Sequence, residues 1–276
     1  MSVSLQPAPP VHPEPAAGVR ASRLAGPPGE LLARLPGLAP VVLRAANGGA
    51  ALRVEAEPNA LQRCGGHCLL PACGAQLRVD PQRWGAAFAL DQGRAGRRHE
   101  GLRFLDRAGE TALSVDLTAA SDRGVYHELA GGVAPLRPLP ASGAVADDGI
   151  LVEGEAVAAV DPTLVGELLE TLADAAIPAR LTLPGNGLWL TATTLIGNPR
   201  LVSGRTEVHG AGVRLSLDPH CHWRAEVQRL PSGDGRAHAL DLYGPDGRRI
   251  LRLAGQEVPG RPEDGAWRTL VGALVR

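Results

Sequence analysis

Hydrophobic and polar residues alternate in short stretches along most of this chain, a pattern that predicts antiparallel strands with one buried face. In the first half, such stretches include residues 41–43, 77–79 and 87–90. In the second half they include residues 180–183, 188–190 and 213–217. The stretches are too short for amphipathic helices, so the chain is predicted to be rich in antiparallel sheet.

Two hairpins are the clearest local signals. Residues 102–109 lead through a turn into residues 111–117, and residues 240–247 lead into residues 250–253. Each turn contains a glycine, Gly109 or Gly247, which adopts the positive φ of a tight turn without steric cost.

Helical segments are predicted on both sides of these strands. Leu164, Leu168, Leu169 and Leu172 fall on one helical face, and Asp161-Pro162 is a typical helix start. Ser121 or Asp122 is expected to cap a helix after the first hairpin. Pro262-Glu263-Asp264, with two acidic residues at the positive end of the helix dipole, is expected to begin another after the second. A helix, several strands, a hairpin and a helix therefore occur in each half, which indicates an α+β module present twice.

The chain also repeats itself, with an offset close to half its length. Residues 29–32 (Gly-Glu-Leu-Leu) return at 166–169, Asn47-Gly48 returns as Asn186-Gly187, and Trp84 is matched by Trp223. We interpret this as a tandem duplication of one helix/antiparallel-sheet/helix module, with two half-domains related by a pseudo-two-fold axis. The predicted organisation is a disordered tail (1–27), an N-terminal repeat (28–130), a linker (131–160) and a C-terminal repeat (161–276). A cleft between the repeats is the expected ligand site.

Charge and composition exclude several classes of protein. The 28 basic residues are all arginine and are balanced by 29 acidic ones, so no basic footprint of a nucleic-acid-binding protein is present. No apolar run has the length of a membrane span, and residues 1–18 lack the pattern of a secretory signal. Four unevenly spaced cysteines do not suggest a disulfide framework. We expect a cytoplasmic protein without membrane insertion.

The order of these motifs resembles the HemS-type family of bacterial cytoplasmic haemin-transport and haemin-degrading proteins. The match is clearest from Trp223 to Leu270. It includes the hairpin at 240–247, the Gly255–Gly260 loop and the Trp267 helix. In the first half, Trp84, the hairpin at 102–109 and the segment 117–129 are similar to the corresponding family stretch.

The resemblance implies binding of haem between the two copies, for intracellular haemin trafficking or utilisation, with haem degradation and iron release as a further expectation. It also implies a haem importer or an electron donor as partner, and it allows a homodimer. The chain is shorter than the family, and no histidine occurs at 130–160, where family members carry a helix with their axial haem ligand. We therefore favour binding and delivery over catalysis.

Candidate haem contacts follow from the chemistry that haem needs: an axial ligand, an apolar slot and cations for the propionates. His67 and His209 are the candidate axial ligands of the haem iron, and Arg97 and Arg98 are candidates for the propionates. The alternative for each is a solvent-facing turn residue. His220 and His222 could share one strand face and bind a metal or a haem, with a solvent-facing turn as the favoured alternative. Cys64, Cys68 and Cys73 lie near His67, but their spacing is not that of a usual zinc site, so zinc is not expected.

No motif in the sequence indicates a catalytic constellation. Two hypotheses therefore remain open. The first is a haem-binding protein of haemin trafficking. The second is a divergent paralogue that kept the fold, lost haem and acts as a structural or protein-interaction module.

Overall fold

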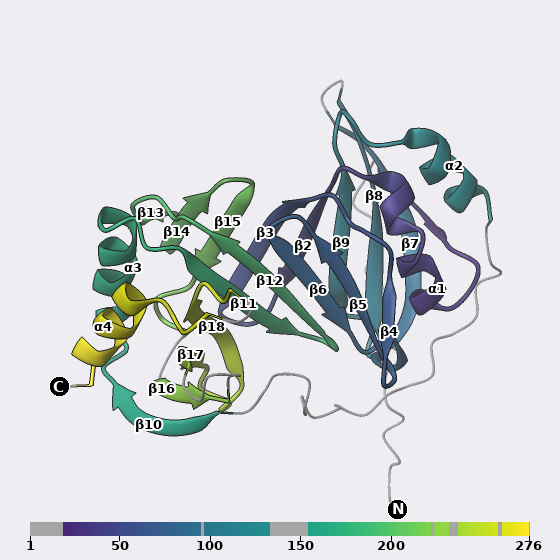
Figure 1. Cartoon of the computed structure of the whole chain (residues 1–276). Helices are drawn as coiled ribbons and strands as arrows, with labels where there is room; N and C mark the ends of the chain where they lie inside the picture. Colours follow the sequence, from purple (N-terminus) through teal and green to yellow (C-terminus); the bar gives the residue numbers. More distant parts are fainter. Residues whose placement is uncertain are drawn as a thin grey trace, which may run out of the picture.

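Two nine-stranded antiparallel sheets form the framework of the protein (Figure 1). The computed structural model describes residues 19–94, 97–132, 154–221, 224–231, 237–258 and 261–275, with the side chains of residues 94, 97 and 98 excepted. Four α-helices accompany the sheets in this part of the chain. The predicted α+β class is therefore confirmed.

The first sheet joins strands from both halves of the sequence. In spatial order it consists of β1 (Val19–Arg23), β7 (Trp84–Arg94), β8 (Arg97–Asp106), β9 (Thr111–Leu117), β2 (Val41–Ala46), β3 (Ala50–Ala56), β15 (Val213–Leu217), β14 (Arg205–Gly210) and β13 (Arg200–Val202).

The second sheet is built in the same way. In spatial order it consists of β10 (Glu155–Val160), β16 (Arg224–Leu230), β17 (Ala237–Tyr243), β18 (Arg249–Gly255), β11 (Ala179–Gly185), β12 (Leu188–Thr194), β6 (Ala75–Val79), β5 (His67–Ala72) and β4 (Gln62–Cys64).

The helices lie at the two ends of the molecule (Figure 1). α1 (Pro28–Leu32) and α2 (Arg123–Gly131) accompany β7 and β8, whereas α3 (Leu164–Asp174) and α4 (Gly265–Ala273) accompany the end with β16 to β18. Asp122 caps α2 and Asp264 caps α4, each by accepting two backbone N–H bonds. Asp161 does not cap α3 directly. Its carboxylate accepts bonds from Thr163, and the helix begins one residue later.

The two halves exchange strands instead of folding as separate modules. β4, β5 and β6 of the first half extend the second sheet, because β6 pairs with β12. β13, β14 and β15 of the second half extend the first sheet, because β15 pairs with β3. The sequence pattern predicts a separate core in each half. Instead, β3 and β12 each have an edge that only the other half covers, so neither sheet is complete without it.

Paired positions in the two sheets correspond to one another through the sequence repeat. In the first sheet Ser114 lies opposite Arg44, Arg44 opposite Arg53, and Arg53 opposite Arg214. In the second sheet, Arg252 lies opposite Thr182, Thr182 opposite Thr191, and Thr191 opposite Gln76. Each residue of the first series is separated from its counterpart in the second by the same distance along the sequence, as 44 is from 182 and 53 from 191. The strand order of one sheet thus corresponds position by position to that of the other.

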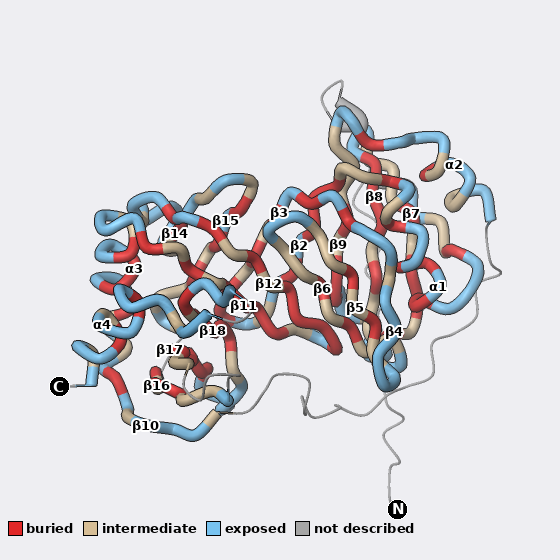
Figure 2. The backbone as a smooth tube through the Cα atoms, in the orientation of Figure 1, coloured by how far each residue is buried: buried red, intermediate tan, exposed pale blue. Residues whose placement is uncertain are grey.

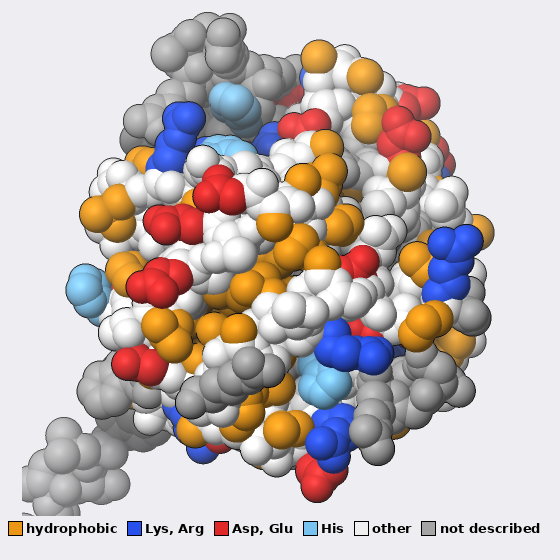
Figure 3. All heavy atoms as spheres, turned by 60° about the vertical axis from the view of Figure 1, so that its left-hand side comes forward, with side chains coloured by type: hydrophobic (Ala, Val, Ile, Leu, Met, Phe, Trp, Pro, Cys, Tyr) orange, Lys and Arg blue, Asp and Glu red, His pale blue; other side chains and the backbone are white. Residues whose placement is uncertain are grey.

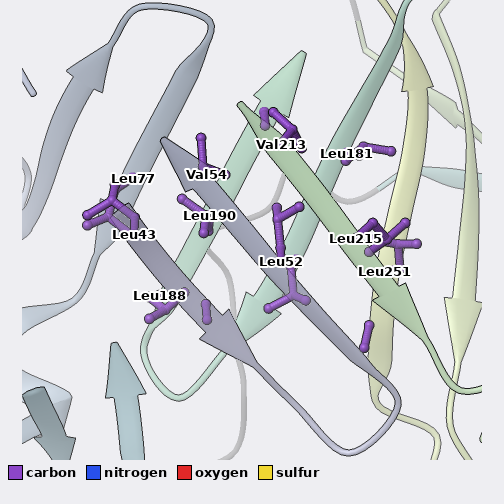
Figure 4. Close-up of a cluster of buried hydrophobic side chains, with 14 of the residues drawn as sticks. Leu43, Leu52, Val54, Leu77, Leu181, Leu188, Leu190, Val213, Leu215 and Leu251 are labelled. Carbon is purple, nitrogen blue, oxygen red and sulfur yellow. The ribbon is translucent and has the colours of Figure 1, made fainter. Parts of the chain in front are cut away.

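The core lies between the sheets and under the helices. Leu43, Leu52 and Val54 of the first sheet face Leu77, Leu188 and Leu190 of the second, and all six are at most 2% exposed (Figure 4). Buried residues accordingly concentrate along the central strands (Figure 2). The face of each sheet that carries these side chains is called its inner face, and the opposite face its outer face.

Backbone hydrogen bonds fasten the two halves at their turns. Asp80 donates its backbone N–H to the carbonyl of Gly187 over 2.8 Å, and Asp218 donates to Gly49 over 2.8 Å. A Cβ on Gly187 would lie 2.7 Å from the Cβ of Arg83, so this close approach requires glycine.

Two strands lie in segments where the sequence pattern predicts none. β1 falls within the predicted tail, although residues 1–18 lie outside the described residues. β10 falls within the predicted linker, at residues 155–160. Both are edge strands whose sequences, Val-Arg-Ala-Ser-Arg and Glu-Ala-Val-Ala-Ala-Val, have few large apolar residues to signal them.

None of the helices in the described part of the chain is both long and apolar enough to cross a membrane. The face turned forward in Figure 3 carries a band of apolar side chains across its middle and no continuous basic area among the residues drawn in colour.

The strand exchange predicts that the halves cannot fold alone. Residues 19–132 produced by themselves should lack a cooperative thermal transition in circular dichroism, because β3 would lose β15 and the facing sheet. Residues 154–275 should behave likewise. Co-expressed, the two fragments should purify together at one-to-one stoichiometry and melt cooperatively. A cooperative transition of either fragment alone would contradict the interlocked fold.

Candidate functional site on the outer face of the second sheet

The outer face of the second sheet carries an unusual concentration of buried polar and aromatic side chains. Strand pairing places Asp241 opposite Arg252, Tyr243 opposite Arg249, and Trp189 opposite Arg78. These six residues are called the outer patch. Trp189 belongs to the second half of the chain and Arg78 to the first, so strand exchange brings them together. The patch exists only because the halves are interlocked.

Asp241 is the electrostatic centre of the patch. It is fully buried, and Arg252 donates to it from two nitrogens, with Nε 2.7 Å from Oδ1 and Nη2 2.8 Å from Oδ2. The Nε of Arg249 lies 2.8 Å from Oδ2 of the same carboxylate. Two guanidinium groups thus share one carboxylate, which leaves an excess positive charge in a buried setting.

Tyr243 lies between two arginines. The guanidinium carbon of Arg224 lies 4.3 Å from the ring centroid and that of Arg249 lies 5.6 Å from it, both within the range of cation–π attraction. Burial raises the pKa of the Tyr243 hydroxyl, and the neighbouring Asp241 carboxylate raises it further, while Arg249 acts in the opposite direction. The phenol is therefore neutral at physiological pH.

Trp189 has a donor without an acceptor. Its side chain is 4% exposed, and its indole Nε1 has no hydrogen-bond partner within the described ranges. Buried indole N–H groups are normally paired, so an unpaired one calls for an explanation. Its position between the proline of β11, Pro184, and Arg78 of β6 places it in the middle of the outer face.

His67, one of the two predicted haem ligands, lies on the same face. Leu69 pairs with Arg78, so these two residues share the outer face, and Cys68 and Leu70 point to the core. Alternation along β5 then puts His67 on the outer face, two residues from Leu69. Its side chain is partly exposed.

The other predicted site residues lie elsewhere. His209 is in β14 of the first sheet, where its side chain is 55% exposed and its Nε2 lies 3.5 Å from Glu207. The backbone of Arg97 and Arg98 forms the start of β8, also in the first sheet, but their side chains lie outside the described residues. The structure therefore does not bring His67 and His209 together.

Two further candidates from the sequence can be placed. His220 lies in an exposed turn, and His222 lies outside the described residues. Cys64 and Cys73 are exposed, whereas Cys68 is buried in the core. Over the ranges that the structure describes, no group of three or more histidine, cysteine or acidic side chains is arranged to hold a metal ion.

A hollow of about 690 Å³ adjoins the patch where the turns of both halves meet. Pro184 and Arg249 border it on the patch side, and three more arginines line it: Arg83, Arg107 and Arg248. Its size is within the range of small-molecule sites, and its cations suit an anionic ligand. The expected hollow between the halves is thus present, although neither predicted histidine lines it.

Sequence reasoning missed most of the outer patch. Arg78, Trp189 and Tyr243 each stand at an alternating position in a short strand, which predicts only that they face away from the core or into it. The signal that could have singled them out is polarity: Asp241 and Arg252 interrupt otherwise apolar strands of the second hairpin.

Removal of the Asp241 carboxylate should strongly destabilise the fold. Asp241→Ala leaves Arg249 and Arg252 buried without a counter-charge, and breaking such an ion pair costs about 3–5 kcal/mol. The free energy of unfolding from urea titration measures this. Asp246→Ala, in the exposed turn of the same hairpin, is the matched control and should cost about 1 kcal/mol or less. Equal effects of the two variants would contradict the role given to Asp241.

The ionisation of Tyr243 provides a test of its electrostatic surroundings. In a Tyr126→Phe background, the remaining tyrosine should titrate above the ordinary pKa of a phenol when followed by ultraviolet absorbance. Arg249→Gln should raise the midpoint further, because it removes a cation that stabilises the phenolate. A midpoint that stays unchanged or falls in Arg249→Gln would refute this arrangement.

Comparison with known proteins finds one similar curated protein and several similar solved structures. No family model matches the chain. The hemin transport protein HmuS of Yersinia pestis is 26% identical over 263 residues, which cover 78% of this chain and 74% of that protein.

Solved structures share the fold over nearly the whole chain. The heme degrading enzyme ChuS of Escherichia coli O157:H7 superposes with a TM-score of 0.84 at 20% identity, covering 93% of this chain and 87% of that one. The heme-binding protein PhuS of Pseudomonas aeruginosa, in its holo form, superposes with a TM-score of 0.79 at 20% identity, covering 92% and 86%. The chain is thus similar in sequence to HmuS and shares its fold with ChuS and PhuS.

Proposed function

We propose that this protein binds haem and serves intracellular haemin trafficking or utilisation. The observation that carries the proposal is the relationship to HmuS, a hemin transport protein, over most of both chains. The fold shared with ChuS, a heme degrading enzyme, and PhuS, a heme-binding protein, supports it. The cytoplasm is the proposed location.

The outer patch of the second sheet is the proposed haem site, because its residues fit the chemical needs of haem. Arg78 and Arg249 supply cations for the propionates. Trp189 and Tyr243 place aromatic rings beside these cations. His67, on the same face, would supply the axial imidazole to the iron.

Binding and delivery are proposed ahead of haem degradation. When bound, haem itself activates oxygen in haem-degrading proteins, and the protein supplies orientation and an axial ligand. The patch residues offer orientation through charge and stacking, and the one carboxylate of the patch, Asp241, is already held by Arg249 and Arg252. A haem importer, an electron donor and a second copy of the chain remain proposed partners.

We further propose that the two sheets arose by tandem duplication and are related by a pseudo-two-fold axis. The constant sequence offset between corresponding paired positions, as from Arg44 to Thr182 and from Arg53 to Thr191, supports this. The matched pair of backbone hydrogen bonds between the halves, from Asp80 to Gly187 and from Asp218 to Gly49, also supports it.

Titration of the purified full chain with haemin tests the proposed function. A shifted Soret band that saturates at one haemin per chain is expected. Arg78→Gln should weaken binding by roughly tenfold or more, since a charge-assisted hydrogen bond contributes about 1.5–3 kcal/mol. His67→Ala should change the position of the Soret band, because the iron would lose its proposed imidazole.

Two controls separate the sites. Arg34→Ala, which removes an exposed arginine just after α1, should leave haemin affinity unchanged. His209→Ala should also leave it unchanged if the site lies on the second sheet. A loss of binding confined to His209→Ala would move the haem site to the first sheet.

One observation favours the alternative, a divergent paralogue without haem that acts as a structural or interaction module. Asp241 already engages Arg249 and Arg252, so two of the three arginines of the outer patch are partly neutralised from within. Under this alternative the haemin titration gives only the spectrum of free haemin, in the unaltered chain and in every variant.

A further inference from the structure

A row of arginines crosses the outer face of the first sheet. Arg44, Arg53 and Arg214 lie directly opposite one another on the neighbouring strands β2, β3 and β15. Like charges placed opposite one another in a sheet are destabilising, so this arrangement does not serve the stability of the fold. These three residues are called the arginine row.

The fold does not require arginine at these positions. At the corresponding positions of the repeat, the second sheet carries Thr182, Thr191 and Gln76 instead, all uncharged. The same backbone position thus accepts neutral side chains in one sheet, and the three cations of the other sheet call for a separate reason.

The guanidinium groups of the row have donors to spare. The Nε of Arg44 lies 2.7 Å from Asp116, Nη1 of Arg53 lies 3.1 Å from Glu55, and Nη2 of Arg214 contacts Glu207. In each of these ion pairs one nitrogen contacts a carboxylate, although a guanidinium has five N–H donors. Their side chains are 55%, 35% and 46% exposed. In the second sheet, by contrast, Arg252 donates from two nitrogens to the buried carboxylate of Asp241.

A hollow of about 370 Å³ lies over the row. All three arginines line it, together with Glu207, the ion-pair partner of Arg214. Small side chains that leave space and hydroxyls that can donate or accept complete the lining: Ala46, Ala51, Thr111, Ser114 and Ser216. The volume is near the lower limit of small-molecule sites, so a small ligand is indicated.

We propose that the arginine row binds a small di- or tricarboxylate. Neighbouring strands are about 4.8 Å apart, so three guanidinium groups spread over roughly 10 Å. That spacing suits carboxylates separated by a few carbon atoms, each received by the planar fork of an arginine. The site is independent of the haem proposal, since it lies in the other sheet and uses none of the residues of the outer patch.

Isothermal titration of the full chain without haemin tests this, with tricarballylate, succinate and acetate as probes at one fixed ionic strength. Affinity should rise with the number of carboxylates. Arg53→Ala should lower the affinity for tricarballylate at least tenfold. Arg53→Lys should also lower it, because the lysine ammonium lacks the planar pair of donors of a guanidinium. Arg34→Ala is the matched control and should have no effect. Since Thr191 holds the equivalent position, Arg53→Ala is expected to fold, which its urea midpoint verifies.

Three results would overturn the proposal. Equal affinity for all three probes, or none at low ionic strength, would exclude a carboxylate site. Equal losses in Arg53→Ala and Arg34→Ala would show non-specific charge attraction. A tenfold preference for pyrophosphate over tricarballylate would assign the row to phosphates instead. Because the haemin titration involves different residues, its outcome does not depend on any of these.

Discussion

The pairing of β3 with β15 and of β12 with β6 is the constraint on which the rest of this structure depends. Each pairing joins a strand of one half to a strand of the other, so each sheet is completed by residues distant in sequence. An unpaired strand edge exposes backbone donors and acceptors to other chains, and the exchange removes two such edges at once. It also makes the core continuous, because the inner faces of both sheets then cover one another. The outer patch and the arginine row both span these junctions.

The two junctions show how corresponding positions of the two sheets can carry different chemistry on the same pattern of strand pairing. On the second sheet, charge is concentrated in the hairpin as a buried pair, Asp241 with Arg252, and the junction carries a single arginine, Arg78, opposite Trp189. On the first sheet, Ser114 stands where Arg252 would be, and the charge is on the junction as exposed arginines. A buried, compensated charge holds a shape, whereas exposed and partly compensated guanidinium groups are available to an external anion. The charges of the second sheet thus fix its structure, whereas the arginines of the first sheet are accessible to a ligand.

Local features of the fold could be predicted from the sequence, and long-range ones could not. The hairpins at Gly109 and Gly247 and the caps at Asp122 and Asp264 depend on neighbouring residues, whose types report directly on backbone geometry. The exchange of β4–β6 and β13–β15 left no such signal. Alternation of apolar and polar residues shows that a strand has an inner face, but it does not show whether the neighbouring strand comes from the same half or from the other. The edge strands β1 and β10 could not be predicted because they contain few large apolar residues.

The candidate site follows the same division. His67 could be selected from the sequence by its residue type, and the fold places it on the face of the outer patch. Arg78 and Trp189 could not be selected in this way, because neither stands out in its own strand. Only their pairing across the two halves marks them as part of a site. A site assembled across a strand junction is invisible to any inference that treats the halves separately.

This placement has a thermodynamic consequence for any ligand of the outer patch. His67 and Arg78 come from the first half, whereas Trp189, Tyr243 and Arg249 come from the second. A molecule that contacts both sets binds only when β6 is paired with β12, so its binding energy adds to the free energy that holds the halves together. The same linkage works in reverse: a change that loosens the junction lowers affinity without touching a contact residue. In this fold, the integrity of the interlocked sheets and the capacity to hold a ligand on the second sheet are two measures of one equilibrium.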